Sequence, residues 1–145
     1  MNFSVNDETS KLISVIIGIA NNSGGTPKLE DLYDPKSIEN LKSGSYPLES
    51  KMIIELDNFS NVLKKYGVNV YRPKNIKNCN QIFARDVGFV INDCFFKSNI
   101  LPKREKEYDG IEDIIKSFNG KIINIPENVH VEGGDIITLN KNIFI

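Results

Sequence analysis

Two carboxylates flank a pair of glycines near the end of the printed sequence. In the stretch "VEGGD", Glu132 and Asp135 stand on either side of Gly133 and Gly134. Glycines adopt backbone angles closed to other residues, which allows a sharp turn or a close approach of a ligand to the backbone. A partly buried carboxylate is costly unless it meets a cation, and a flat guanidinium matches a carboxylate bidentately. The stretch therefore predicts a place for a guanidinium group, which belongs either to an arginine of the protein or to a ligand.

Two further charged stretches precede this motif. "ARD" at 84–86 holds Arg85 and Asp86, and "PKRE" at 102–105 holds Arg104. Adjacent residues of a strand point to opposite faces, so Arg85 and Asp86 cannot both face one site unless a bulge intervenes. One of them is expected to serve the structure and the other the site. Taken alone, each stretch is typical of ordinary surface charges.

The elements that position these stretches follow a regular order. Residues 82–91 and 94–98 predict a β-hairpin that turns at Asn92 and Asp93. Asp109, with Glu112 three residues later, predicts a helix that begins with a capping box. The apolar stripe of this helix and its stop are Ile111, Ile114, Ile115, Phe118 and Gly120.

A strand over 121–125 and a last hairpin of 136–139 with 143–145 complete this part of the chain. The order is thus a ββαβ unit followed by the start of another. A recurring unit predicts an α/β architecture in which each unit covers the apolar face of its neighbour. The strand over 143–145 ends the sequence inside a unit, and its unpaired edge is expected to allow self-association.

The first half of the chain predicts a simpler arrangement. Residues 12–20 predict a buried strand, 21–47 a long loop, and 68–71 a second strand. Between them, residues 47–66 predict a helix that ends at Gly67. The apolar face of this helix is expected to be Met52, Leu56, Phe59, Leu63 and Tyr66.

Composition excludes several classes of protein. The 145 residues fit a single domain, and 18 Lys and Arg nearly balance 19 Asp and Glu, so neither nucleic-acid nor membrane-surface binding is expected. The longest apolar run, 12–20, is too short to span a membrane, and the acidic N-terminus does not resemble a secretory signal; the sequence predicts a cytoplasmic protein. Cys79, Cys94 and His130 lack the spacing of a zinc site and predict buried free thiols and a structural or exposed histidine.

Order and spacing turn the charged stretches into one stronger signal. "FARD", a hairpin, "PKRE", a helix, a strand and "VEGGD" resemble, in that order, the guanidino-group modifying superfamily of amidinotransferases, arginine and agmatine deiminases and dimethylarginine dimethylaminohydrolases. Upstream, "SGSYP", a helix and "YGVNVYRP" are similar to the start of amidinotransferases such as the inosamine-phosphate enzyme. The resemblance implies a five-bladed α/β propeller of ββαβ units, the pentein fold, of which residues 1–145 would form about half as a single truncated domain.

The resemblance also implies a chemistry and site residues. In the family a cysteine thiolate attacks the guanidinium carbon, and water or an acceptor amine resolves the amidino-thioether. Asp86 and Glu132 would bind the substrate guanidinium, with Asp135 in a supporting role, and Arg104 would hold a substrate carboxylate. The partner would be a small guanidino compound, with no cofactor and no metal.

The sequence departs from the family pattern in its catalytic groups. The family's histidine lies downstream of "EGGD" and its cysteine near the C-terminus, so His130, Cys79 and Cys94 do not match either position. The chain is therefore expected to be inactive alone. Transferase and hydrolase remain open, because the first half favours the former and the paired glycines the latter, and a non-catalytic pairing module is the alternative from another class.

Overall fold

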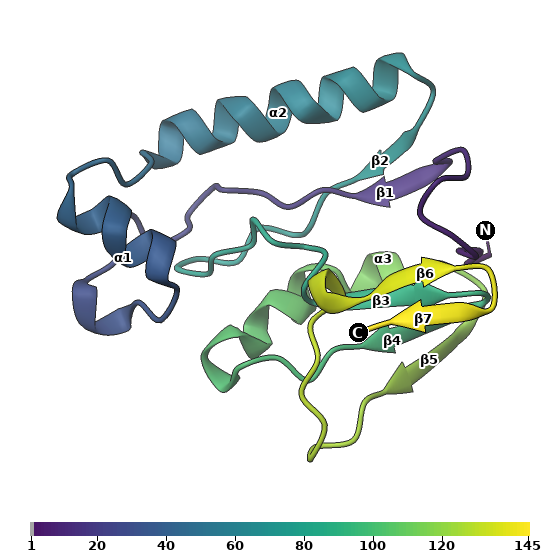
Figure 1. Ribbon diagram of the computed structural model, residues 1–145. Coiled ribbons are helices and arrows are strands. Elements are labelled where there is room, and N and C mark those ends of the chain that lie inside the picture. The colour runs from purple at the N-terminus through teal and green to yellow at the C-terminus, as the bar shows by residue number, and fades with distance from the viewer. Residues whose placement is uncertain (1) are drawn as a thin grey trace.

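The computed structural model describes residues 2–145, whose strands form three small sheets (Figure 1). The first sheet pairs two strands in parallel, the second has the order β3-β4-β5, and the third is an antiparallel pair. The strands are β1 (Ser14–Ile16), β2 (Asn69–Tyr71), β3 (Gly88–Ile91), β4 (Cys94–Lys97), β5 (Lys121–Asn124), β6 (Ile137–Leu139) and β7 (Asn142–Phe144).

The first sheet lies beneath the long helix α2 (Glu49–Lys65) (Figure 1). The helix confirms the prediction over 47–66, and Gly67 ends it with a φ of +79°, in the left-handed region that favours glycine. The predicted strand over 12–20 is only three residues long. The apolar face of the helix is covered in part, because Phe59 and Tyr66 remain 54% and 79% exposed.

The predicted loop over 21–47 is wrong in one respect, because it contains a helix. A 3-10 turn, η1 (Leu29–Asp31), precedes α1 (Pro35–Lys42). The Asp34 carboxylate accepts a hydrogen bond from the backbone N–H of Ser37 at 2.6 Å, and Pro35 occupies the first helical position. Both are local start signals for a helix.

The middle sheet confirms the predicted ββαβ unit. β3 and β4 form an antiparallel hairpin across Asn92 and Asp93, and Asn92 has the positive φ of 54° that such a turn requires. β5 then pairs with β4 in parallel. The predicted first strand is shortened, because residues 84–87 form a turn.

The connection between β4 and β5 differs from its prediction in how the helix begins. A 3-10 segment, η2 (Pro102–Gly110), leads directly into α3 (Glu112–Lys116), and Asp109 is an exposed residue of η2 and not a cap. Because the backbone N–H of Ile111 already donates to the carbonyl of Tyr108 at 2.9 Å, no capping box is needed. Ile111 and Ile115 are buried as predicted.

The hydrophobic core lies between the middle sheet and this helical connection. Its buried members are Phe3, Val87, Phe95, Tyr108, Ile111 and Ile115. Phe3 was not predicted as a core residue, and its ring stacks on Phe118 with centroids 5.4 Å apart. The segment around it bonds to the β3-β4 turn through Val5 and Asn92, so the start of the chain closes the core.

The last hairpin, β6-β7, confirms its prediction and leaves a large apolar surface open to solvent. Ile137, Leu139, Ile143 and Phe144 are all about half exposed. Across residues 2–145 the three sheets stay separate and form no closed ring. In the same range, none of the helices is long and apolar enough to cross a membrane.

Candidate functional site: a carboxylate cluster around Arg104

The topology of the middle sheet brings the predicted site residues to one of its edges. β3 and β4 are antiparallel and β4 and β5 parallel, so the start of β3 and the ends of β4 and β5 lie side by side, with Gly88 opposite Lys97 and Lys97 opposite Asn124. Asp86 precedes β3, Arg104 follows β4, and Glu132 follows β5. Residues far apart in the sequence therefore converge.

The Arg104 guanidinium binds three carboxylates at this edge. Its Nε and Nη2 donate to Oε1 and Oε2 of Glu107 at 2.7 and 2.9 Å, in a bidentate pair. Nη1 donates to Oε1 of Glu132 at 3.0 Å, and Nη2 also donates to Oδ2 of Asp86 at 3.2 Å. We call these four side chains the Arg104 cluster.

Burial gives the Arg104 cluster its electrostatic character. The side chains of Arg104 and Glu107 are 10% and 5% exposed, whereas Asp86 and Glu132 are 21% and 34% exposed. Burial raises the pKa of Glu107, although the Arg104 guanidinium opposes this effect. The hydrogen bonds that Arg104 donates to Glu107 raise the pKa of Arg104, so its charge is permanent. Three carboxylates and one guanidinium leave a formal charge of −2 when all are ionised.

Glu107 was missed by the sequence analysis. It lies three residues after Arg104, a spacing at which side chains of a helical turn meet. This spacing was the feature of the sequence that could have indicated the ion pair. In the sequence the pair is hidden in the charged run "KREKE", in which Lys103, Glu105 and Lys106 are exposed.

Arg85 and Asp86 divide their roles, though not for the predicted reason. They belong to a turn, in which the backbone N–H of Asp86 donates to the carbonyl of Phe83 at 3.1 Å, so the alternation of a strand does not apply. Arg85 donates through Nη2 to the carbonyl of Ile136 at 2.8 Å and to Glu8 at 3.3 Å. It thus ties this turn to the segment that leads into β6.

The two glycines of "EGGD" are required by close packing and not by their backbone angles. Neither lies among the residues with positive φ. Gly133 donates from its N–H to the carbonyl of Asp86 at 3.2 Å, and a Cβ there would overlap the carbonyl oxygen of Arg85. A Cβ on Gly134 would lie 3.0 Å from Oδ1 of Asp86. The sequence predicted a sharp turn or the close approach of a ligand, whereas the structure shows the close approach of another chain segment.

Asp135 lies outside the Arg104 cluster. It ends the 3-10 turn η3 (Gly133–Asp135), is exposed, and accepts a hydrogen bond through Oδ2 from the backbone N–H of Glu132 at 3.3 Å. This contact holds the backbone that carries Glu132.

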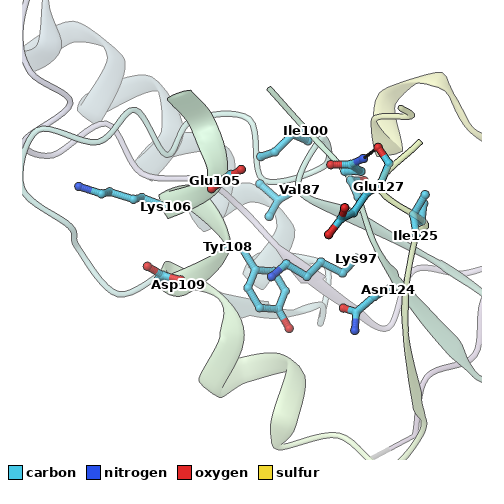
Figure 2. Close-up of a pocket in the computed structure, with 12 residues that line it drawn as sticks. Val87, Lys97, Ile100, Glu105, Lys106, Tyr108, Asp109, Asn124, Ile125 and Glu127 are labelled. Atoms are coloured by element: carbon cyan, nitrogen blue, oxygen red, sulfur yellow. Dashed lines mark hydrogen bonds between the residues drawn. The ribbon is translucent and has the colours of Figure 1, made fainter. Parts of the chain in front are cut away.

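A cavity of about 460 Å³ lies at the same edge of the sheet (Figure 2), and no side chain of the Arg104 cluster lines it. Val87, Glu105 and Tyr108, which line it, are chain neighbours of cluster residues. Figure 2 shows Lys97 extended across the ring of Tyr108, with its Nζ 3.9 Å from the ring centroid.

The residues excluded as family catalysts do not join the cluster. His130 is exposed, and its Nδ1 lies 3.4 Å from the carbonyl oxygen of Asn99. Cys79 and Cys94 are free and half-buried, so the predicted free thiols are confirmed, although neither is fully buried. Burial is the main reason that the pKa of each thiol is raised, the opposite of what a nucleophile needs. Among residues 2–145, His, Cys, Asp and Glu form no group suited to a metal ion.

The chain has the same fold as solved amidinotransferases and a solved dimethylarginine dimethylaminohydrolase. The chain superposes on SxtG, an amidinotransferase of Microseira wollei in the saxitoxin biosynthetic pathway, with a TM-score of 0.75 and 17% identity, over 97% of this chain and 53% of that one. For the inosamine-phosphate amidinotransferase of Streptomyces griseus the TM-score is 0.67 at 14% identity, with the same coverage. For a dimethylarginine dimethylaminohydrolase bound to S-methyl-L-thiocitrulline it is 0.68 at 16% identity, over 92% and 49%.

These similarities define the fold. The mixed helix and strand arrangement of residues 2–145 is the fold of about half of each of these solved amidinotransferases and of the dimethylarginine dimethylaminohydrolase, so the resemblance found in the motifs extends to the fold. The chain spans about half the length of these solved enzymes. No protein family model and no curated protein matches the sequence.

The packing of the glycines predicts a graded response to alanine. Gly133→Ala should destabilise the chain strongly, because its Cβ overlaps a backbone carbonyl that cannot move without shifting the turn at 84–87. Gly134→Ala should cost less, because its Cβ meets only the end of the Asp86 side chain. Urea unfolding of both variants measures the order, and an equal loss for the two would contradict this account.

The raised thiol pKa values predict slow alkylation. A raised pKa lowers the thiolate fraction at neutral pH, so the reaction of Cys79 and Cys94 with iodoacetamide should accelerate as the pH rises past the ordinary thiol value of about 8.5. Cys79→Ser and Cys94→Ser report on one thiol each. Half-titration of either thiol below pH 8 would show an activated cysteine and contradict the assignment.

Proposed function

We propose that these 145 residues are the substrate-binding half of a guanidino-modifying enzyme and bind the guanidinium group of arginine or a related compound. The observation that carries this proposal is the Arg104 cluster: carboxylates from three chain segments surround a guanidinium group at one edge of the sheet. The fold shared with amidinotransferases and amidinohydrolases supports it. The complete enzyme would be a five-bladed propeller.

The roles of the residues follow from their contacts and from the resemblance. Asp86 and Glu132 bind the substrate guanidinium, and Asp135 orients Glu132 through its backbone. Arg104 holds a substrate carboxylate. The reaction proceeds through a Cys-amidino intermediate, which in the resembled family needs a histidine and a cysteine. His130, Cys79 and Cys94 do not match those positions, so the chain alone is inactive. It needs no cofactor.

The reaction subclass proposed first is amidino transfer. The first half of the chain, with "SGSYP" and "YGVNVYRP", supports it. Amidino hydrolysis is the second choice, because of the paired glycines in "VEGGD". Solved structures of both subclasses share the fold.

Ligand binding tests the proposed function. Calorimetry with L-arginine and agmatine should show binding by the unmodified chain, and Asp86→Asn and Glu132→Gln should each weaken it at least tenfold, about 1.4 kcal/mol. Asp113→Asn, an exposed carboxylate away from the cluster, is the matched control. Equal affinity in all four proteins would contradict the proposed binding site. Formation of citrulline or urea, or amidino transfer, catalysed by the chain alone would contradict its proposed inactivity.

A second candidate function is a pairing module without catalysis. The observation that favours it is the apolar surface of β6 and β7, where β7 is bonded on one side only. Exposed apolar surface next to an open strand edge is a common site of association.

Self-association through this edge is expected at high concentration. Light scattering should give a mass above that of the monomer, and Ile143→Lys should return it to the monomer because it places a charge on the paired surface. Ile54→Lys, an equally exposed position on α2, is the control and should change nothing. A monomer at every concentration would exclude the pairing module.

A further inference from the structure

We propose that Asp86, Glu107 and Glu132 form one guanidinium site whose resident occupant is the Arg104 side chain, and that a guanidinium ligand enters by displacing it. The inference rests on the proposed function only in the class of ligand. It adds Glu107 to the binding residues and gives Arg104 a role that precedes any contact with a substrate carboxylate.

The contacts of Arg104 show what the site binds. Each of its three guanidinium nitrogens donates to a carboxylate, at distances from 2.7 to 3.2 Å. A ligand guanidinium in the same place has the same shape and charge, and its nitrogens would find the same acceptors. The site is therefore already complete for a flat cation, and it is filled by one.

Burial explains why the occupant and the ligand exclude each other. Glu107 is 5% exposed and depends on a guanidinium partner, since an unpaired buried carboxylate is costly. While Arg104 holds both oxygens of Glu107, a second guanidinium has no such place, although the formal charge of −2 still attracts it. A ligand that replaces Arg104 restores the partner of Glu107 at once.

The attachment of Arg104 to the chain makes it a strong competitor. A tethered group competes at a high effective concentration. The apparent dissociation constant of a ligand equals its intrinsic value divided by the fraction of molecules in which Arg104 has left the site, so it rises as that fraction falls. A ligand should therefore bind far better once the Arg104 side chain is removed.

The exchange also reconciles two expectations for Arg104. The resemblance implies that it holds a substrate carboxylate, yet the structure points its guanidinium at three carboxylates of the protein. A displaced Arg104 is a free cation beside the bound guanidinium. One movement thus opens the site and supplies a group for the other end of an arginine-like ligand.

Methylguanidinium at millimolar concentration tests the proposal on the full chain, because it carries the flat cation without a carboxylate. By NMR titration, Arg104→Ala should bind it at least tenfold more tightly than the unmodified chain does. Arg72→Ala, which removes an arginine that pairs with Asp57 away from the cluster, is the matched control and should show no gain. An equal gain in both variants, or none in Arg104→Ala, would overturn the proposal.

Two further readouts separate displacement from added negative charge. The Nε–H signal of Arg104, one of only three arginines in the chain, should move to the position of a solvated guanidinium as methylguanidinium saturates the unmodified chain. A signal that stays in place at saturation would overturn the proposal. Adding Glu107→Gln to Arg104→Ala should cost at least tenfold in affinity, and an unchanged affinity would remove Glu107 from the site.

The design keeps the outcomes distinct. The Nε–H measurement uses the unmodified chain, and Arg104→Gln replaces Arg104→Ala if the latter does not fold. L-arginine that binds through Asp86 while the Arg104 signal stays in place supports the proposed function and refutes the exchange. If methylguanidinium binds Arg104→Ala tightly and the unmodified chain binds neither L-arginine nor agmatine, the exchange is supported and the proposed function is refuted. Methylammonium, a cation without the flat fork, should bind none of these proteins.

Discussion

The bidentate pair between Arg104 and Glu107 is the interaction on which the site depends. Both side chains are almost fully buried, and neither charge is tolerable there without the other. Removing one partner of such a pair typically costs about 3–5 kcal/mol. Since the guanidinium also reaches Asp86 and Glu132, the same cation holds the turn before β3, the segment after β4 and the segment after β5 at one edge of the sheet.

Close backbone packing also holds the segments that carry the carboxylates together. Gly133 brings the "EGGD" segment against the turn that carries Asp86, at a distance that no side chain would allow. Arg85 reinforces the same junction from outside through the Ile136 carbonyl and Glu8. The carboxylates are thus aimed by backbone contacts between two segments, and the positions of Asp86 and Glu132 do not depend on flexible side chains alone.

A site made of three carboxylates and one arginine differs from an empty pocket. Its charge and shape are specific for a flat cation, and that specificity is already used within the chain. The affinity of such a site for a guanidinium ligand depends on the difference between two free energies: that of the site holding the ligand and that of the site holding the Arg104 side chain. The same fold occurs in solved enzymes that modify guanidino groups.

Local signals in the sequence predicted the elements that depend on a few neighbouring residues. Asn92 marked the hairpin turn and Gly67 the helix end, because both positions need a positive φ that few residues adopt. The helix α1 was predictable in the same way from Asp34 and Pro35, but the surrounding turn residues hid it. The capping box at Asp109 failed because the preceding 3-10 segment already satisfies the helix start.

By itself, the sequence determined the order of the ββαβ unit and the chemistry to expect from its charged stretches: carboxylates that need a guanidinium. Only the tertiary structure decided which guanidinium they hold, that Glu107 is the third carboxylate and that Phe3 closes the core. The physical reason is that periodicity and turn signals act between near neighbours. The partner of a buried charge is selected by where distant segments meet, and strand pairing fixes that place.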